Sequence, residues 1–292
     1  MITSYIFTDR SALDTAVEAW ITDEAAAIET YGDINTWDVS GITDFSWLFR
    51  DKTEFNSDIS DWDVSNGTHF AGMFYGAASF NQDIGDWDVS NCKRELNYMF
   101  EGAKAFNQDL NNWDVSNVTE FYQTFANTDA FNGDISDWDV SNASLAGMFS
   151  NAKAFNQDIG DWDVSNTKHF NSMFQNADAF NQDIGDWDVS NASHFGNMFY
   201  RAIAFNQDIS DWDVSNATFF VGMFERSSSF NQDISDWDLS KARWVSSMFK
   251  DADAFDQDLQ YWDLDEISPN DMQRFFEGAD KMLAKGWSAT PL

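Results

Sequence analysis

Aspartate is the residue type in this sequence whose spacing could do most chemistry. The tetrapeptide Trp-Asp-Val-Ser, or a close variant with Leu, occurs ten times, at steps of 25 residues except for one of 26 and one of 24. Carboxylates repeated in this way can bind metal cations or attract basic proteins, and pairs of them can act as acid and base. The tryptophans of the repeat are Trp37, Trp62, Trp87, Trp113, Trp138, Trp162, Trp187, Trp212, Trp237 and Trp262.

The repeat predicts two rows of aspartates. Trp and Val alternate with Asp and Ser, which is the period of a β-strand, so the Asp side chains are expected to face away from the Trp side chains. With one strand in each coil, neighbours within a row would be about 4.8 Å apart, and the two rows about 7 Å apart. The first row holds Asp38, Asp63, Asp88, Asp114, Asp139, Asp163, Asp188, Asp213, Asp238 and Asp263. The second holds Asp61, Asp86, Asp137, Asp161, Asp186, Asp211 and Asp236, with breaks at Thr36, Asn112 and Tyr261.

Such rows carry an electrostatic cost that predicts either shifted pKa values or bound cations. Two carboxylates at this spacing repel by roughly 1 kcal/mol in water, so some pKa values should rise. Calcium prefers oxygen ligands and is the candidate ion between the rows, although flat strands are poorly suited to supply about six oxygens to one ion. A solvated acidic face, or adaptation to high salt, explains the same residues without a specific ion.

Catalysis is disfavoured because the acidic pairs are not differentiated from one another. Their spacing resembles that of glycosidase acids, but nearly every coil has the pair, which makes it architectural. His169 and His194 occupy the same repeat position in adjacent coils and are expected about 5 Å apart. They could hold a metal, but exposed decoration is the simpler interpretation. The sequence therefore predicts a protein that is not an enzyme.

Charge and hydropathy exclude two classes of partner. The chain has 50 acidic against 16 basic residues and a formal charge of -34, which repels nucleic acid and anionic membrane surfaces. No apolar run approaches the ~20 residues of a membrane span, and residues 1–10 contain no signal-peptide core. A protein or another cationic surface is the expected partner.

The periodicity predicts an α/β solenoid whose coils each contain a short strand and a short helix. Strands one repeat apart run in the same direction and would stack into a parallel sheet. After each strand the apolar spacing changes to three and four, as in Val118, Phe121 and Phe125, which is typical of a helix face. Ser-Asn pairs such as Ser65-Asn66 are interpreted as helix caps. The sequence Phe-Asn-Gln-Asp is expected to form a turn through side-chain bonds to the backbone.

Both ends depart from the repeat and are expected to cover it. Residues 1–32 are predicted to form an N-terminal helical cap, with helices at 11–20 and 23–31. Residues 33–265 would form the solenoid of about ten coils. Residues 266–292 would form a C-terminal cap with a helix at 271–285, and all three parts would belong to one continuous domain.

The repeat resembles a known family. The spacing of Ile59, Trp62 and Val64 is similar to the L-x-x-L-x-L core of leucine-rich repeats. With the Val-Thr-x-Phe segment, the Met-Phe pair and the closing Phe, the coil resembles the BspA-like leucine-rich repeat, in the 25 to 26-residue bacterial surface-protein form called the domain of unknown function 285 family. The usual Asn of such repeats would fall at Gly67, whereas this chain has Asn66. The resemblance implies a leucine-rich-repeat-like solenoid, extracellular or cell-surface display, adhesion and protein binding.

The sequence thus favours a non-enzymatic binding or adhesion module that presents an acidic concave sheet to a protein or cationic surface. The alternative is a calcium-dependent structural or assembly protein in which ions bridge the two Asp rows.

Overall fold

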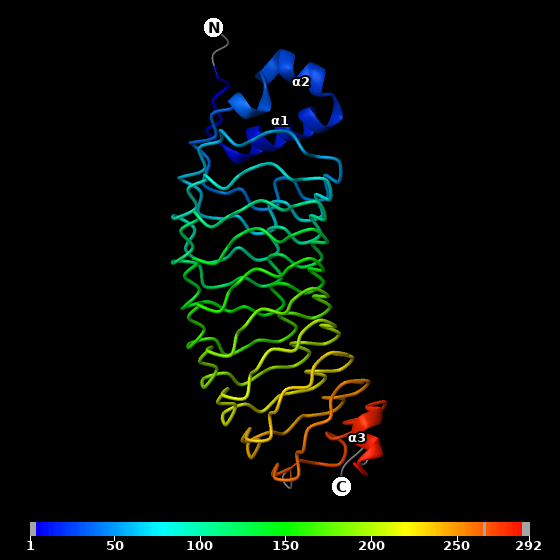
Figure 1. Cartoon of the computed structure of the whole chain (residues 1–292). Coiled ribbons are helices and arrows are strands. Elements are labelled where there is room, and N and C mark those ends of the chain that lie inside the picture. Colours follow the sequence, from blue (N-terminus) through cyan, green and yellow to red (C-terminus); the bar gives the residue numbers. More distant parts are fainter. Residues whose placement is uncertain (1–3, 265–266, 288–292) are drawn as a thin grey trace.

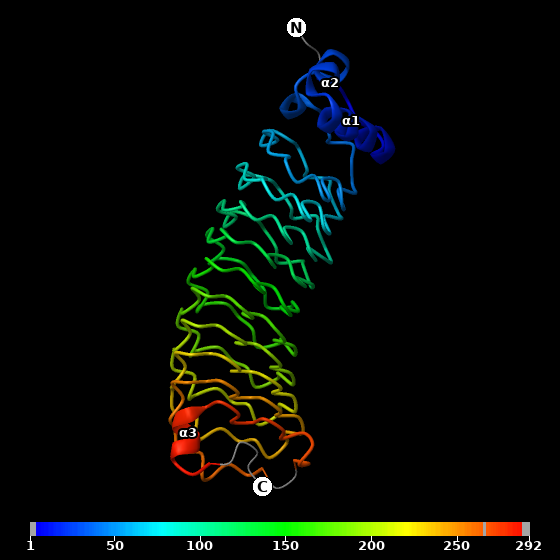
Figure 2. The same cartoon turned by 90° about the vertical axis from the view of Figure 1, so that its right-hand side faces the viewer.

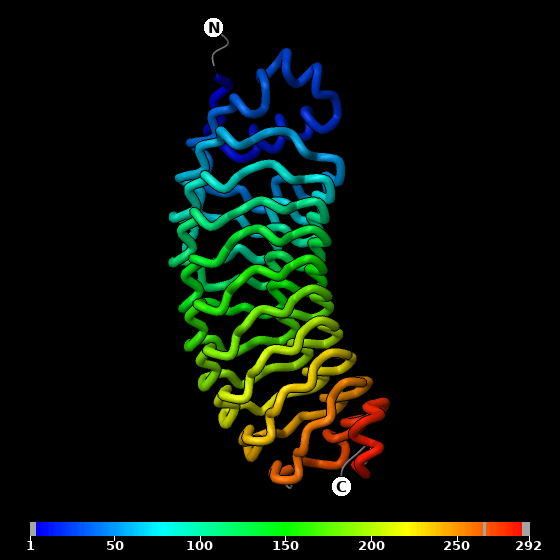
Figure 3. Tube along the Cα trace, viewed as in Figure 1, coloured from blue at the N-terminus to red at the C-terminus, as the bar shows by residue number. Residues whose placement is uncertain are grey.

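The chain forms an elongated stack of coils that curves along its length (Figures 1 and 2). A computed structural model describes residues 4–264 and 267–287. Two helices, α1 (Arg10–Thr22) and α2 (Glu24–Tyr31), lie at one end of the stack and α3 (Asp280–Ala284) lies at the other (Figure 1). A short 3-10 helix, η1 (Ile34–Thr36), leads into the first coil. The tube in Figure 3 shows the coils following one another in sequence order.

The two N-terminal helices form where the sequence predicts them. The Asp9 carboxylate accepts from the N–H of Ala12 at the start of α1, and the Asp23 carboxylate accepts from Ala26 at the start of α2, which are N-caps. The apolar face of α1 buries Trp20, whose ring lies edge-on to Trp37 with centroids 5.9 Å apart. This contact seats α1 against the first coil.

Backbone hydrogen bonds join successive coils in the segment that contains the Met-Phe pairs. Phe45 donates to the carbonyl of His69 (2.8 Å), and every second residue up to Asp51, which donates to Tyr75 (2.7 Å), bonds in the same way. The pairing is parallel. Bridges of this kind link Asp44 to His69, Glu95 to Glu120, Glu120 to Ser144, His169 to His194, His194 to Phe219 and Phe219 to Trp244.

The prediction that this segment is helical is wrong. Among the described repeat residues no α-helix occurs there, because alternate N–H groups donate to the neighbouring coil instead of to the residue four positions back. The segment is a run of tight turns with left-handed residues four apart, such as Gly72 (φ 60°) and Gly76 (φ 67°). Gly and Asn tolerate this conformation, and the same two positions hold Asn197 and Arg201 in a later coil. The three-and-four spacing that suggested a helix is the spacing of these turns.

The prediction of a strand in Trp-Asp-Val-Ser is also wrong, although its two faces are correct. In the described chain this segment has no strand and forms turns. Trp87 and Val89 are buried, whereas Asp86 and Asp88 are exposed. Coils are joined here through side chains: the indole N–H of Trp87 donates to the carbonyl of Ile59 in the coil before it (3.3 Å), and the other repeat tryptophans from Trp62 to Trp262 do the same at 2.8–3.3 Å.

Side-chain amides supply two more ladders between coils. In Phe-Asn-Gln-Asp the Asn oxygen accepts the N–H of the equivalent Asn one coil later, as Asn156 does from Asn181 (2.8 Å), and Gln182 donates to the Asn156 carbonyl (2.8 Å). The Asn of the Ser-Asn pair is not a helix cap, because Asn66 donates to the carbonyl of Ser40 in the preceding coil (2.9 Å). Ladders of this kind satisfy buried and half-buried polar groups without a regular sheet.

Stacked aromatic rings fill the interior. The phenylalanines that close the coils stack on one another, and Phe80, Phe106 and Phe131 have centroids 5.9 Å apart. Each also stacks on the Phe of the Met-Phe pair in its own coil, as Phe155 does on Phe149 (3.7 Å), or on Phe125 of the Thr-Phe pair, as Phe131 does. The result is one continuous hydrophobic core from Phe7 to Met282.

The C-terminal part differs from the predicted cap. The helix predicted at 271–285 is confined to Asp280–Ala284. Before it, Val245 donates to Asp271 and Asp251 donates to Glu277, so residues 271–277 continue the ladder of the preceding coils. Phe275 and Phe276 take the buried positions that Met-Phe pairs hold elsewhere. The predicted boundary between repeats and cap at residue 265 lies outside the described residues.

Candidate functional site: the acidic face

The structure places the predicted aspartates on the turns of the Trp-Asp-Val-Ser segments. All seventeen are exposed except Asp38, which is half-buried. Apart from Asp38, which forms a parallel bridge with Ile6, they lie outside the parallel bridges, which join the Met-Phe segments. The predicted acidic sheet is therefore an acidic row of turns, and we call the two rows together the acidic face.

The aspartates of the first row from Asp38 to Asp238 each have one oxygen engaged within their own turn. Oδ1 of Asp163 accepts from the N–H of Ser165, two residues later, at 3.0 Å. This is an Asx turn, in which the side chain replaces a backbone acceptor. The same bond, at 2.9–3.1 Å, forms at Asp38, Asp63, Asp88, Asp114, Asp139, Asp188, Asp213 and Asp238. The motif's Asp-x-Ser pattern is thus a structural device as well as a source of charge.

Hydrogen bonding outweighs repulsion at the aspartates of this row whose pKa is shifted, which are Asp88, Asp163, Asp213 and Asp238. The Ser165 hydroxyl and N–H lower the pKa of Asp163, and Ser90 lowers the pKa of Asp88 in the same way. At Asp213 the bonds from Ser215 lower the pKa, and the neighbouring Asp238 opposes them only weakly. The predicted rise in pKa is not found at these residues. Since a carboxylate with a lowered pKa stays ionised in mild acid, Asp88, Asp163 and Asp213 keep their charge there.

The second row lies beside a third set of aspartates that the sequence interpretation treated only as turn residues. Asp161 and Asp186 line a hollow of about 170 Å³ together with Asp158 and Asp183, which come from the Phe-Asn-Gln-Asp turns. The next hollow, also about 170 Å³, lies one coil further on. The signal was present as Asp-x-x-Asp in most coils. It was missed because the Asp of Phe-Asn-Gln-Asp was assigned to a turn that bonds to the local backbone, and only the second Asp of the pair was assigned to the acidic rows.

No described group has the form of a metal centre. Within residues 4–264 and 267–287, no three His, Cys, Asp or Glu side chains are gathered so that they could hold an ion. His169 and His194 do lie side by side as predicted, with ring centroids 4.8 Å apart. Burial, followed by the charges of His194 and Lys168, lowers the pKa of His169. Calcium between the rows and a metal on the two histidines stay predictions.

A cluster of exposed and half-exposed aromatic residues on the ladder segment was not foreseen. Trp47 lies near Tyr75 and Tyr98, with ring centroids 5.7 and 6.1 Å away, and Tyr98 contacts Tyr122 edge-on at 5.3 Å. The Arg50 guanidinium lies 5.2 Å from the Trp47 ring centroid and 5.5 Å from that of Tyr75, within cation–π range. Outside this cluster the position of Trp47 holds residues such as Gly, Ser, Gln123 or Asn197, so the departure to an aromatic residue was the available signal.

Comparison with known proteins identifies the family. Three overlapping segments, residues 21–130, 95–205 and 181–288, match the family described as "Mycoplasma protein of unknown function, DUF285". The chain belongs to the DUF285 family. No curated protein matches the sequence of this DUF285 chain. Nor, among the residues described, is any helix long and apolar enough to cross a membrane.

One solved structure resembles the DUF285 chain weakly. It is the plant peptide hormone receptor RGFR1 in complex with RGF2, with a TM-score of 0.31 and 7% sequence identity. The similarity covers 76% of this chain but only 39% of the receptor chain.

Proposed function

We propose that the protein is a non-enzymatic binding module and that the acidic face recognises a basic surface on a protein partner. The observation that supports this most strongly is the run of exposed aspartates from Asp63 to Asp238, each held by an Asx turn to the serine two residues later. These bonds fix the carboxylates in successive coils, and they lower the pKa of Asp88, Asp163, Asp213 and Asp238, which therefore stay ionised in mild acid. A repeated, oriented field of one sign favours encounter with a partner of the opposite sign.

The shape of the molecule supports a large partner. The hollows on the acidic face are small, about 170 Å³ each, whereas sites for drug-sized ligands are usually 300–1,000 Å³. A protein surface can span several coils at once. The resemblance of the repeat to BspA-like leucine-rich repeats supports adhesion and cell-surface display as the setting in which such binding acts.

Neutralising the face without disturbing its turns tests the proposal. A variant carries six Asp→Asn changes, at Asp139, Asp163, Asp188, Asp161, Asp186 and Asp211. Asparagine retains the oxygen that accepts in the Asx turn, so the fold should be kept. Binding of poly-L-lysine is measured by calorimetry at 50 and 300 mM NaCl. We expect about tenfold weaker binding at 50 mM, and a smaller loss at 300 mM because salt screens the remaining charge.

The matched control removes charge elsewhere. The control variant carries Glu29→Gln, Asp253→Asn and Asp280→Asn, at exposed positions outside the two rows. A second variant with six changes restricted to the first row tests whether that row alone accounts for binding. If the control lost as much affinity per charge as the acidic-face variant, net charge rather than the face would account for binding.

A calcium-dependent structural role is the second candidate. The hollow lined by Asp158, Asp161, Asp183 and Asp186 favours it, because four carboxylates surround one space. Their side chains would have to turn towards a common point, since they form no ligand group as they lie. A melting midpoint that is the same with calcium and with a chelator would exclude this role.

A further inference from the structure

The hydrogen bonds of the Asn ladder all run in one direction, and the groups left without a neighbouring coil at its two ends have different partners. In each step the backbone N–H of one Asn donates to the side-chain oxygen of the Asn in the preceding coil, from Asn81 to Asp256, at 2.7–2.8 Å. The last member, Asp256, has unused acceptors, and Lys285 closes them. Its ammonium donates to the Asp256 carbonyl (2.7 Å) and lies 2.8 Å from Oδ1.

The first member, Asn56, has no such closure. Its Oδ1 accepts from Asn81, but no group in the described chain accepts from its own N–H. The same holds two residues earlier. Ser79 donates to the carbonyl of Thr53 in the coil before it, whereas Glu54, at the equivalent position, has no preceding coil to bond. Two donors, the N–H groups of Glu54 and Asn56, therefore face the side of the first coil towards α1.

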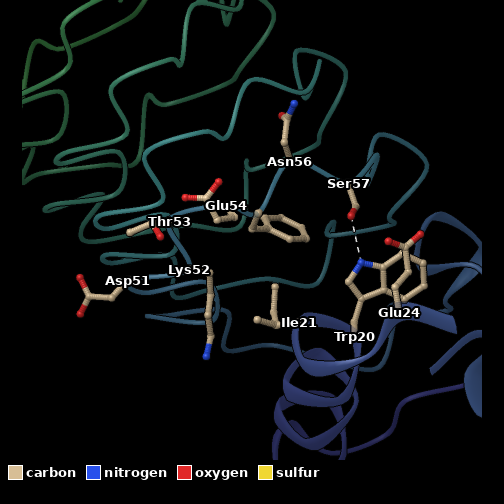
Figure 4. A pocket seen from close by; sticks show the side chains of 10 residues that line it. Trp20, Ile21, Glu24, Asp51, Lys52, Thr53, Glu54, Asn56 and Ser57 are labelled. Atoms are coloured by element: carbon tan, nitrogen blue, oxygen red, sulfur yellow. Dashed lines mark hydrogen bonds between the residues drawn. The ribbon is translucent and has the colours of Figure 1, made fainter. Parts of the chain in front are cut away.

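A cavity of about 470 Å³ lies on that side. It is lined by Trp20 and Ile21 of α1, by Glu24 of α2 and by residues 51–57. Figure 4 shows the Asn56 amide pointing away from Trp20 and Ile21, towards the next coil. Ser57 stands where most later coils have Gln. Its Oγ accepts from the Trp20 indole N–H (2.9 Å; Figure 4), and the hydroxyl proton stays free to donate.

The charge of the cavity determines which kind of hydrogen-bond acceptor a ligand can bring to these donors. Glu24, Asp51 and Glu54 line it, and its single lysine, Lys52, is paired with Glu18 on α1. A carboxylate ligand would be repelled, so the acceptors must be neutral. Peptide carbonyls and a carboxamide oxygen meet this condition and are the groups that every later coil offers to the next.

We propose that this cavity binds an extended peptide segment that ends in asparagine and carries a basic residue, and that the segment adds one step to the start of the Asn ladder. The Asn oxygen accepts from Asn56 N–H, and its carbonyl accepts from the Ser57 hydroxyl. The carbonyl three residues earlier accepts from Glu54 N–H, as Thr53 accepts from Ser79. The chain contains such a segment twice, as Lys-Ala-Phe-Asn at 104–107 and 153–156.

The probe is the capped peptide acetyl-Lys-Ala-Phe-Asn-amide, with Asp and Ala in place of Asn as comparison peptides. Calorimetry on the full chain should show about tenfold tighter binding of the Asn peptide than of either comparison, because the others lose an acceptor or add a negative charge. The peptide should also slow hydrogen exchange of the Glu54 and Asn56 amides, whereas the Asn81 amide, which is already bonded, stays unchanged. Equal binding of the three peptides, or unchanged exchange at Glu54 and Asn56, would overturn the proposal.

Two exposed isoleucines supply a matched pair of variants. Ile21 (39% exposed) lines the cavity, and Ile28 (42% exposed) on α2 does not. Ile21→Arg should weaken binding of the Asn peptide at least about tenfold by occupying the cavity, and Ile28→Arg should leave it within about twofold. Equal losses would place the peptide elsewhere. The six-change variant of the acidic face should bind the peptide normally, so this test is independent of the proposed function.

Discussion

At the scale of the residue, the aspartate of Trp-Asp-Val-Ser has two roles that oppose each other electrostatically. One oxygen accepts from the serine two residues later, and the carboxylate as a whole contributes to a dense negative face. The hydrogen bonds outweigh the repulsion between carboxylates at Asp88, Asp163 and Asp213, because the pKa of each is lowered. A folded-state pKa below the unfolded value stabilises the fold above the unfolded pKa, and this stability is lost as pH falls through the folded pKa.

Acid unfolding should therefore depend on whether these residues can titrate. In the wild type these carboxylates make their full contribution to the free energy of unfolding above about pH 5, and that contribution declines below about pH 4. A variant with Asp88, Asp163 and Asp213 changed to Asn keeps the turn acceptors but cannot be protonated, so its decline should be shallower. The matching Ala variant should lose about 0.5–1 kcal/mol per site at every pH. Urea unfolding at pH 3, 5 and 7 measures both, and parallel pH curves for wild type and Asn variant would contradict this account.

At the scale of the element, the coil is held by ladders of several kinds rather than by a strand and a helix. Backbone bonds join the turns of the Met-Phe segments, indole N–H groups join the Trp segments, and amides join the Phe-Asn-Gln-Asp turns. Because each ladder is repeated at every coil, removing one rung leaves its neighbours in place. The cost of a break is local.

A single rung of the Asn ladder gives a measurable case. Asn156→Ala removes the acceptor for the N–H of Asn181 and should lower the free energy of unfolding by about 1–2 kcal/mol. Asn156→Asp keeps an oxygen at the same place, and the ladder itself has Asp256 at this repeat position. This control should stay within about 0.5 kcal/mol of wild type. Faster exchange of the Asn181 amide in the Ala variant alone would locate the effect, and equal exchange in both variants would count against the ladder.

The sequence predicted which side chains of a coil are buried better than it predicted the secondary structure of the coil. Alternation correctly placed Trp87 and Val89 inside and Asp88 outside, because burial depends on side-chain direction and not on the class of backbone. The helix was wrong because three-and-four spacing also arises from successive turns, and the left-handed residues at Gly72 and Gly76 were not weighed. The partnership of Asp161 with Asp158 could not be predicted from an assumed strand. The open end of the Asn ladder depends on how α1 lies relative to Asn56. The period of the repeat says nothing about that arrangement, so the open end could not be predicted.

At the scale of the whole molecule, the net charge of -34 acts on every coil. Within residues 4–264 and 267–287, eleven pairs of oppositely charged groups lie within 4.0 Å. Most have exposed side chains, so they offset little of the repulsion. The aromatic core opposes it with stacked rings along the whole length. Stability should therefore depend on how strongly the solvent screens the charge.

Monovalent salt should stabilise the protein. Raising NaCl from 50 to 500 mM shortens the screening length from roughly 14 to 4 Å, and the melting temperature should rise. The six-change Asp→Asn variant should show a smaller rise, because it has less repulsion to screen. Differential scanning calorimetry measures both values, and a melting temperature that fell with salt in the wild type would contradict this view of the charge.

The Asn, Trp and backbone ladders also affect how the number of coils can change during evolution. Each coil offers to the coil after it the same groups that it receives from the coil before it, as Asn156 does between Asn132 and Asn181. A tandem duplication or loss of 25 codons within the array would therefore insert or remove a coil that already matches both neighbours. The length of the protein can thus change in whole steps, while the helices at either end keep the contacts that they have.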